Sequence, residues 1–308
     1  MSLNAAVDVT YVVDGLEPGR EHAVREVARF AGGKANNVAR VAAALGHQVI
    51  ATGFAGGPNG RFIEEALRSQ GVAAEFVPMA GENRNAVTII DRTGRSSTLL
   101  REPGPQLTAA DAERFLQQFR RLIRRVDFAV ISGALPPGIP DDFYGELVST
   151  AYRVAQVRCV VDACGDALRG VVPAQPYMVK PNLDELSEWA GRRLKGDGEI
   201  LAAAQALMEA GPLVVAVSLG PGGMLLVSPE GAWRAVPPEV VESNTVGSGD
   251  ALVAGLMAGL LEGRSAEEIL RMAVACGTAN ATTRGVAEVD LNTVASLARQ
   301  VRVERLSS

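Results

Sequence analysis

One glycine-rich turn runs directly into a long apolar helix and carries an acidic residue at the junction. In ESNTVGSGDALVAGLMAGLL, residues 242–261, the turn is Gly247, Ser248 and Gly249, and the acid is Asp250. Glycines let several backbone N–H groups converge at a helix N-terminus, whose partial positive charge binds anions such as phosphate. A carboxylate there is placed to take a proton from an attacking hydroxyl group. The alternative is a structural role, in which the glycines form a tight turn and Asp250 only accepts hydrogen bonds from free backbone N–H groups at the helix start.

A second segment, AGGKANNVARVAAALG at residues 31–46, places polar groups at another predicted helix start. Two glycines precede Lys34, Asn36 and Asn37. The glycines permit close backbone approach, and a lysine with amide groups at a helix N-terminus suits a phosphorylated or hydroxylated ligand. The alternative is a glycine turn with an asparagine cap.

A third segment, VKPNLDEL at residues 179–186, contains Asn182 and Glu185 three positions apart. Their shared helical face is suited to a Mg²⁺–water cluster, although the same spacing is typical of an ordinary helix start. Two glycine-containing loops, residues 132–138 and 218–227, involve the ends of predicted buried strands. In parallel sheets, loops at the carboxyl ends of strands line the ligand crevice.

Strand-like apolar runs alternate with amphipathic helical runs, which predicts an α/β fold with a mostly parallel central sheet flanked by helices. The runs expected to form buried parallel strands are residues 47–53, 126–132, 158–163 and 213–218. A helix is expected over residues 34–45. The pairs Thr108/Asp111 and Ser265/Glu268 have the spacing of capping boxes that open two further helices.

Two segments, residues 7–29 and 86–101, alternate apolar and polar side chains and contain turn signals. The second is typical of a hairpin, with VTIID and SSTLL on either side of RTGR. We expect these segments to form a small antiparallel sheet outside the main layer. A flap of that kind would be able to close over a site.

Composition excludes several classes of function. The 308 residues are 47% hydrophobic and 21% charged, with a net charge of −5, which is typical of a globular protein with a sizeable core. The acidic balance gives no electrostatic reason to expect nucleic acid or an anionic membrane as a partner. Three cysteines without a CxxC pair argue against a structural zinc site. With no secretory leader pattern and no apolar run long enough to cross a bilayer, we expect a cytoplasmic protein.

Taken together and in this order, the motifs resemble the PfkB/ribokinase family of sugar kinases. Residues 32–56 are similar to the first family signature, and NTVGSGD at 244–250 is similar to the second. The resemblance implies a single ribokinase-like α/β domain over residues 1–308. It also implies a lid built from two inserted segments, about 9–30 and 84–104, and use of ATP with Mg²⁺.

Finer features resemble the branch that phosphorylates ketohexose phosphates, which includes 1-phosphofructokinase, tagatose-6-phosphate kinase and a minor bacterial 6-phosphofructokinase. LNAAVD, GGKANNVAR, ENRNAVTII and REPGP carry this resemblance. The chain departs from the family and branch patterns at six positions, which are Ala5, Ala35, Asn83, Arg101, Asn244 and Ser248.

The resemblance also implies roles for individual residues. The expected sugar ligands are Asp8, Gly33, Lys34, Asn37 and Arg84, with Lys34 and Arg84 at the phosphate of the sugar. The expected nucleotide ligands are Lys180, Asn182, Ser218, Gly220, Gly222, Gly249, Cys276, Gly277 and Asn280. Asn182 and Glu185 would organise Mg²⁺. Gly247, Ser248 and Gly249 would form the anion hole, and Asp250 would be the base.

We therefore expect ATP-dependent phosphorylation of a ketohexose phosphate, first of all fructose 1-phosphate to fructose 1,6-bisphosphate. Two cations at the sugar site favour a substrate that already carries a phosphate. Tagatose-6-phosphate or fructose-6-phosphate kinase activity stays open, as does a different class, a non-catalytic sensor of sugar phosphate or nucleotide. Family members often pair through their lids, so a homodimer is compatible with the sequence.

Overall fold

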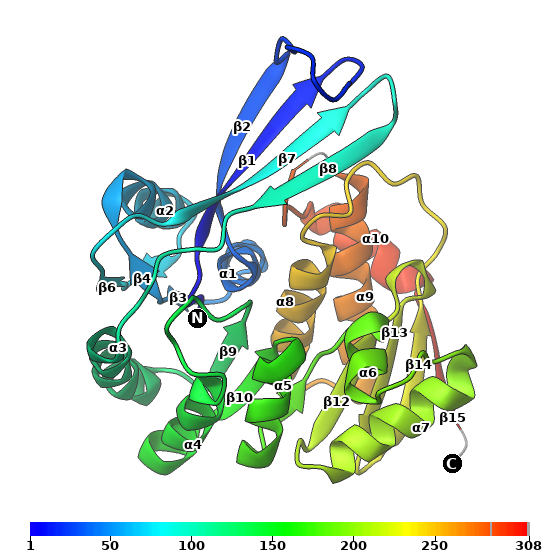
Figure 1. Ribbon diagram of the computed structural model, residues 1–308. Coiled ribbons are helices and arrows are strands. Elements are labelled where there is room, and N and C mark those ends of the chain that lie inside the picture. Colours follow the sequence, from blue (N-terminus) through cyan, green and yellow to red (C-terminus); the bar gives the residue numbers. More distant parts are fainter. Residues whose placement is uncertain (284, 307–308) are drawn as a thin grey trace.

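A computed structural model describes residues 1–283 and 285–306, and its body is built on a seven-stranded sheet (Figure 1). The strand order is β15-β14-β13-β12-β11-β10-β9. The strands span Phe128–Ser132 (β9), Arg158–Asp162 (β10), Met178–Val179 (β11), Val214–Ser218 (β12), Met224–Ser228 (β13), Gly231–Val236 (β14) and Arg302–Leu306 (β15). The α/β architecture that the sequence predicts is confirmed.

One detail of the sheet differs from the prediction, because the sheet is mixed. Strands β9 to β12 are mutually parallel, whereas β12 to β15 pair antiparallel. The parallel half is connected by helices, as parallel strands require. The antiparallel half begins where the short 3₁₀ turn Gly220–Gly222 (η3) sends β13 back beside β12.

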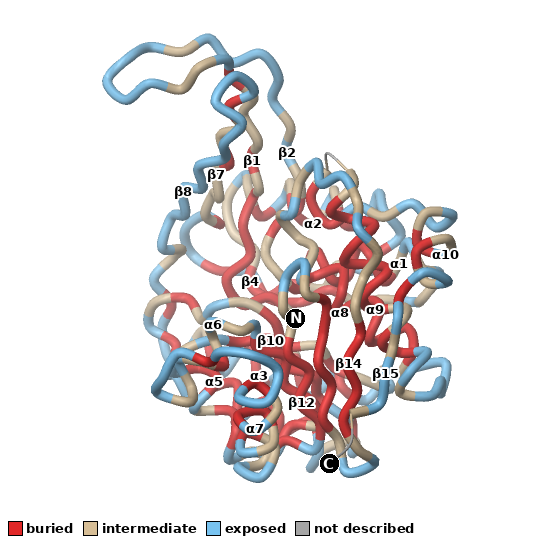
Figure 2. The backbone as a smooth tube through the Cα atoms, turned by 90° about the vertical axis from the view of Figure 1, so that its right-hand side faces the viewer, coloured by how far each residue is buried: buried red, intermediate tan, exposed pale blue. Residues whose placement is uncertain are grey.

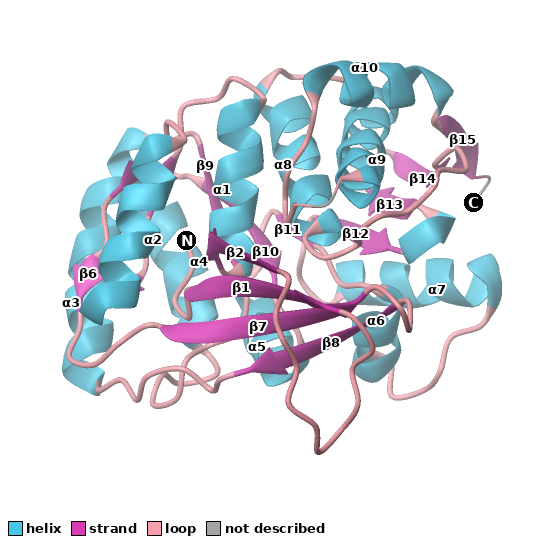
Figure 3. Cartoon of the chain, turned by 90° about the horizontal axis from the view of Figure 1, so that it is seen from above, coloured by secondary structure: helices cyan, strands magenta, loops and turns pink. Residues whose placement is uncertain are grey.

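Helices cover both faces of the sheet (Figure 3). They span Lys34–Ala44 (α1), Gly57–Ser69 (α2), Ala109–Leu122 (α3), Phe143–Ala155 (α4), Gly165–Val171 (α5), Leu183–Trp189 (α6), Gly196–Glu209 (α7), Ser248–Leu261 (α8), Ala266–Thr282 (α9) and Leu291–Gln300 (α10), with 3₁₀ turns at Ile123–Arg125 (η1) and Val172–Ala174 (η2). The predicted capping boxes at Thr108/Asp111 and Ser265/Glu268 are present at the starts of α3 and α9.

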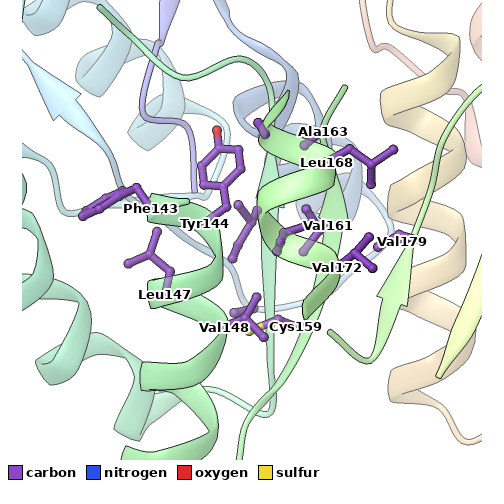
Figure 4. Packing of buried hydrophobic residues seen from close by; sticks show 14 of the residues in the cluster. Phe143, Tyr144, Leu147, Val148, Cys159, Val161, Ala163, Leu168, Val172 and Val179 are labelled. Atoms are coloured by element: carbon purple, nitrogen blue, oxygen red, sulfur yellow. The ribbon is translucent and has the colours of Figure 1, made fainter. Parts of the chain in front are cut away.

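The strands are buried on both faces, as a parallel sheet covered by helices requires. Neighbouring residues of β10 show this, because Val161 packs in the cluster with α4, α5 and α7, and Val160 packs in the cluster with α8 and α9. Figure 4 shows the first cluster between α4, α5 and the sheet. There Tyr144 has its ring in the core and donates its hydroxyl to the carbonyl oxygen of Gly133 at 3.0 Å. Core packing thereby fixes the loop that follows β9.

Helix α8 is apolar around its whole circumference and is almost entirely buried, as such a pattern predicts. It packs between α1 and α9. A β-carbon at Gly255 would lie 2.7 Å from the Cα of Ala273 on α9, so only glycine permits this close approach. Close packing against α1 and α9 fixes the position of α8 along its axis and hence the position of its N-terminus.

A second, four-stranded sheet projects from the body and forms the lid (Figure 1). Its order is β2-β1-β7-β8, and its strands span Ala6–Val13 (β1), Glu26–Gly32 (β2), Arg84–Asp91 (β7) and Ser96–Arg101 (β8). The hairpin predicted within 86–101 is confirmed as β7 and β8. Two short pairs lie near the base, Ile50–Ala51 (β3) with Ala73–Ala74 (β5), and Phe54–Ala55 (β4) with Val77–Pro78 (β6).

The lid is not the purely antiparallel sheet that the sequence predicted. Each of its two segments forms an antiparallel pair, but β1 and β7 join them in parallel. The two segments leave the body in the same direction, so their central strands meet in parallel. Figure 2 shows buried residues at the base of the lid and exposed residues toward its tip. Among the described residues, no helix is long and apolar enough to cross a membrane.

Removal of one core ring should measure how far the fold depends on this packing. Phe115 on α3 is fully buried, with its ring centroid 5.4 Å from that of Phe54 and 6.4 Å from that of Phe143. We expect Phe115→Ala to lower the free energy of unfolding by about 3–5 kcal/mol, since it leaves a cavity. Leu291→Ala, at a 52% exposed position, is the control and should change it by less than about 1 kcal/mol. Urea unfolding of both variants tests this, and equal losses would contradict it.

Candidate active site

The carboxyl ends of the parallel strands bring together side chains that are distant in the sequence. Ser132 ends β9 and is paired in register with Asp162, which ends β10. Lys180 follows β11, and Asn182 forms a bridge to Ser218 at the end of β12. This edge is where ligands bind in open α/β sheets. The active site is therefore expected at this edge of the sheet.

Asp162 is the central charge of this edge and is 1% exposed. Its carboxylate lies 3.2 Å from Nζ of Lys180 and 3.5 Å from Nζ of Lys34, and it accepts a hydrogen bond from the Ser132 hydroxyl at 3.1 Å. Burial disfavours the charged form, but the two ammonium groups hold the pKa of Asp162 below its ordinary value. Sequence reasoning did not single out Asp162, although an acid that ends a buried apolar strand was a signal.

Asp250 lies in the first turn of α8 and is 7% exposed. Its Oδ2 accepts a hydrogen bond from Nδ2 of Asn37 on α1 at 2.9 Å. Burial, reinforced by the negative charge of Asp162, raises the pKa of Asp250 to about 7. A carboxyl group with that pKa is suited to exchanging protons near neutral pH.

The turn before α8 has the geometry of an anion-binding loop. Gly247 has a φ of 83°, and a β-carbon there would lie 2.6 Å from the backbone nitrogen of Ala287. Nδ2 of Asn280 donates to the Ser248 hydroxyl at 2.9 Å and to the Val246 carbonyl at 3.0 Å. The side chain of Asn280 therefore holds the loop from behind, and the loop N–H groups begin a helix whose dipole favours anions.

A cavity of about 720 Å³ opens beside this loop. Of the expected nucleotide ligands, its lining includes Asn182, Ser218, Gly220, Gly249 and Gly277. Apolar residues that the sequence did not single out complete the lining, including Pro237, Val240, Leu252, Val274 and Ala281. An apolar slot with a few polar groups at one end has the character of a cofactor site.

Four expected nucleotide ligands do not line the cavity, namely Lys180, Gly222, Cys276 and Asn280. Cys276 and Asn280 are fully buried within α9. Lys180 is turned toward Asp162. The helical period explains why only some residues of α9 line the cavity. Gly277 and Thr278 face the cavity, while Cys276 faces the core.

Asn182 and Glu185 form a capping box at the start of α6, which is the ordinary helix start that their spacing also predicted. The Asn182 side chain accepts from the Glu185 N–H, and the Glu185 carboxylate accepts from the Asn182 N–H, both at 2.8 Å. Oε1 of Glu185 also lies 4.0 Å from Nζ of Lys34. An amide oxygen and a carboxylate at the cavity mouth suit a Mg²⁺ ion that takes its other ligands from phosphate and water. Among the described residues, no cluster of three metal-binding side chains occurs.

The lid carries two further residues of the predicted site, Asp8 and Arg84. Asp8 on β1 lies in register between Phe30 of β2 and Ala86 of β7, and Ala86 is paired with Arg101 of β8. Gly32 leaves the space that the Asp8 carboxyl occupies, since a β-carbon would lie 2.1 Å from its Cγ.

The Asp8 carboxyl has arginines for neighbours. Burial raises the pKa of Asp8 to about 6, against the opposing effect of Arg84, Arg40 and Arg101. Arg84 donates to the carbonyl oxygens of Asn4 at 3.2 Å and Glu102 at 3.3 Å. Its guanidinium is therefore held at the base of the lid by the backbone.

Lys34 and Arg84 come from different elements, Lys34 from the start of α1 and Arg84 from the start of β7 in the lid. The Lys34 ammonium faces Asp162 and Glu185 on the body, and these carboxylates, with Asp250, raise its pKa against the effect of burial. Arg84 lies on the lid with Arg101. A buried carboxylate needs counter-charges, which explains why Asp162 attracts Lys34. Gly33, with a φ of 95°, is the N-cap residue of α1.

Known structures share this fold. Phosphofructokinase-2 of Escherichia coli in complex with potassium superposes with a TM-score of 0.90 at 28% identity, covering 97% of each chain. Its complex with fructose-6-phosphate gives a TM-score of 0.89 at 28% identity, again covering 97% of each chain. A Thermotoga maritima protein described as a possible 1-phosphofructokinase gives 0.89 at 27% identity, covering 99% of this chain and 98% of that one.

A family model extends the comparison along the sequence. The model described as pfkB family carbohydrate kinase matches residues 1–293 of the 308. The match includes both glycine-rich segments, the lid and the loops at the sheet edge. The chain therefore belongs to the pfkB family of carbohydrate kinases.

Proposed function

We propose that this carbohydrate kinase transfers the γ-phosphoryl group of ATP to a hydroxyl of a ketohexose phosphate, first of all converting fructose 1-phosphate to fructose 1,6-bisphosphate. The observation that carries the proposal is the position of Asp250. It combines a pKa raised to about 7 with a place at the start of α8, beside the anion-binding loop and the cavity. A non-catalytic sensor would have no need of a base there.

The proposed reaction assigns one task to each part of the site. Asp250 accepts the proton of the substrate hydroxyl as its oxygen forms a bond to the γ-phosphorus. The bond from that phosphorus to the bridging oxygen breaks, and ADP leaves with the electron pair. N–H groups of residues 247–249 stabilise the negative charge of the transferring group. Mg²⁺ near Asn182 and Glu185 would neutralise charge on the nucleotide phosphates.

Lys34 is placed to act on the transferring group rather than on the substrate phosphate. Its ammonium lies at the sheet edge with Asp162, within the electrostatic influence of Asp250. The substrate phosphate is assigned to the lid, where burial and then the nearby charge of Arg101 disfavour the charged form of Arg84 and lower its pKa. A phosphate dianion between two guanidinium groups would relieve that repulsion.

Two related substrates remain candidates within the same chemistry. Fructose 6-phosphate is favoured by one specific observation, since the Escherichia coli relative has been solved with it. Tagatose 6-phosphate would use the same proposed contacts. For partners, we propose a second copy of the chain at the lid. Strand β8 is an exposed edge that carries Leu99 and Leu100, 41% and 54% exposed.

The direct test is ADP release with ATP and Mg²⁺ across fructose 1-phosphate, fructose 6-phosphate, tagatose 6-phosphate, fructose, ribose and adenosine. We expect turnover with one phosphorylated ketohexose at a kcat/KM at least tenfold above that for any neutral compound. Activity restricted to neutral compounds would contradict the assignment of the lid arginines. No turnover with any of them would contradict the proposed function.

Asp250→Asn should abolish turnover while the protein still binds ATP. Loss of a general base costs about 10²–10⁴-fold in kcat. In the wild type, kcat/KM should fall tenfold per pH unit below about 7, because Asp250 is protonated and unable to act as a base there. Steady-state kinetics from pH 5 to 9, with calorimetric ATP titration of the variant, check both results. Unchanged turnover in Asp250→Asn would refute the role of the base.

Arg84→Ala should weaken binding of the phosphorylated substrate specifically. We expect KM for the ketohexose phosphate to rise about 10- to 100-fold, since a charge-assisted hydrogen bond is lost, with a much smaller change for ATP. Arg92→Ala is the matched control, because Arg92 also lies on the lid but is paired with Asp14. Equal effects of the two variants would show that Arg84 does not contact the substrate phosphate.

A further inference from the structure

Arg40 is a buried arginine next to the site that has no task in the proposed reaction. It lies on α1, one helical turn after Asn37, and is 8% exposed. Its Nε donates to Oε1 of Gln70 at 2.8 Å, and its Nη1 donates to Oδ1 of Asn37 at 3.3 Å. Its guanidinium also lies 5.5 Å from the ring centroid of Phe30. Arginine is rarely this buried, so these contacts need an explanation.

We propose that Arg40 is a positioning residue for Asp250, because it fixes the Asn37 amide with its nitrogen, and not its oxygen, toward the base. The inference rests on the proposed role of Asp250. The three groups form a chain of hydrogen bonds, from Nη1 of Arg40 to Oδ1 of Asn37 and from Nδ2 of Asn37 to Oδ2 of Asp250.

The argument follows from what each group is able to donate. The two ends of an asparagine amide have nearly the same shape, so its neighbours decide which end faces which partner. A charged Asp250 only accepts hydrogen bonds, but a protonated Asp250 has an O–H that would donate to the oxygen of a reversed Asn37 amide. Arg40 has donors only, and a reversed amide would point its N–H groups at them. Arg40 therefore favours one orientation of Asn37 in both protonation states of the base, and the Asp8 carboxyl, which also accepts a hydrogen bond from the Asn37 side chain, favours the same orientation.

The fixed orientation has two consequences for the base. An N–H group always faces Oδ2 of Asp250, so the hydrogen bond favours the charged form. With Oδ2 occupied, Oδ1 is the oxygen left to take the proton of the substrate hydroxyl. Without Arg40, a protonated Asp250 gains a hydrogen bond to a reversed Asn37, which stabilises the inactive form.

The charges around Asp250 act in the same site and must be distinguished from Arg40. Asp162 at the end of β10 raises the pKa of Asp250, while Lys34 on α1 and Lys180 after β11 lower it. Arg40 interacts electrostatically with Asp250, and also with Asp8 and Glu288. A test must therefore separate action through Asn37 from the loss of a positive charge.

A merely structural role is the competing explanation, because Arg40 also joins α1 to the end of α2 through Gln70. Gln70→Ala is the matched control. It removes the shorter hydrogen bond of Arg40 and leaves the one to Asn37. If Arg40 only stabilises packing, Gln70→Ala and Arg40→Met should lower the melting temperature and affect the base alike.

The experiment is a titration of the Asp250 carboxyl by ¹³C NMR on the full chain, assigned by loss of its signal in Asp250→Asn. It needs no substrate, so it is independent of whether the proposed sugar phosphate is correct. We expect a midpoint near 7 in the wild type and in Gln70→Ala. In Arg40→Met the midpoint should rise by about one pH unit, which corresponds to loss of one hydrogen bond to a charged group. Arg40→Gln, whose amide both donates and accepts, should give the same rise if Arg40→Met folds poorly.

A double-mutant cycle separates the two routes of action. In an Asn37→Ala background, Arg40→Met should raise the midpoint by less than half as much as it does alone. An equal rise would show that Arg40 acts by charge alone, and an unchanged midpoint in Arg40→Met would overturn the proposal outright. With a substrate that turns over, the acid limb of kcat/KM should move with the midpoint while KM for ATP stays within about twofold. Movement of the midpoint without any sugar turnover would leave the positioning role intact and refute the proposed function.

Discussion

A carboxylate buried between two ammonium groups is the interaction on which the site depends. Asp162 is 1% exposed and would not remain charged without Lys180 and Lys34. Lys180 comes from the neighbouring strand end, whereas Lys34 comes from the first helix, more than a hundred residues away in sequence. The ion pair between Lys34 and Asp162 therefore joins the N-terminal segment to the carboxyl edge of the seven-stranded sheet. It also supplies the negative charge that reinforces the raised pKa of Asp250.

The arrangement divides the positive charge between two places. Lys34 is bound to the body by Asp162 and Glu185, and Arg84 and Arg101 lie on the lid around Asp8. Asp250 follows Gly249, which lines the cavity, and accepts a hydrogen bond from Asn37 on α1. Phosphoryl transfer depends on positioning and charge neutralisation more than on covalent help, and in the proposed reaction this division would serve two separate phosphates. Closure of the lid would exclude water from the space between them.

Local patterns were sufficient to predict the fold and the glycine-rich loops. Alternation identified the lid hairpin, and Thr108 with Asp111 fixed a helix start, because these signals depend on neighbours in sequence. The partner of Lys34 was missed because burial of Asp162 is a property of the assembled sheet. Cys276 and Asn280 were placed at the nucleotide because a motif gives order along the chain, whereas the rotation of α9 decides which side chains face the cavity. The parallel pairing of β1 with β7 likewise arises from the directions in which two distant segments leave the body.

The charge of Asp162 assembles the site, and urea unfolding of Asp162→Asn across pH tests this claim most directly. The variant should lose about 3–5 kcal/mol of stability at pH 7, because the buried Lys180 ammonium loses its ion-pair partner and Lys34 keeps only Glu185 at 4.0 Å. Since the folded pKa of Asp162 is lowered, its contribution is present above the unfolded value of 3.8 and is lost as pH falls through the folded value. The difference between variant and wild type should therefore shrink toward acid pH, whereas Asp141→Asn, at an exposed position, should show no difference. A loss below about 1 kcal/mol that does not change with pH would contradict the claim.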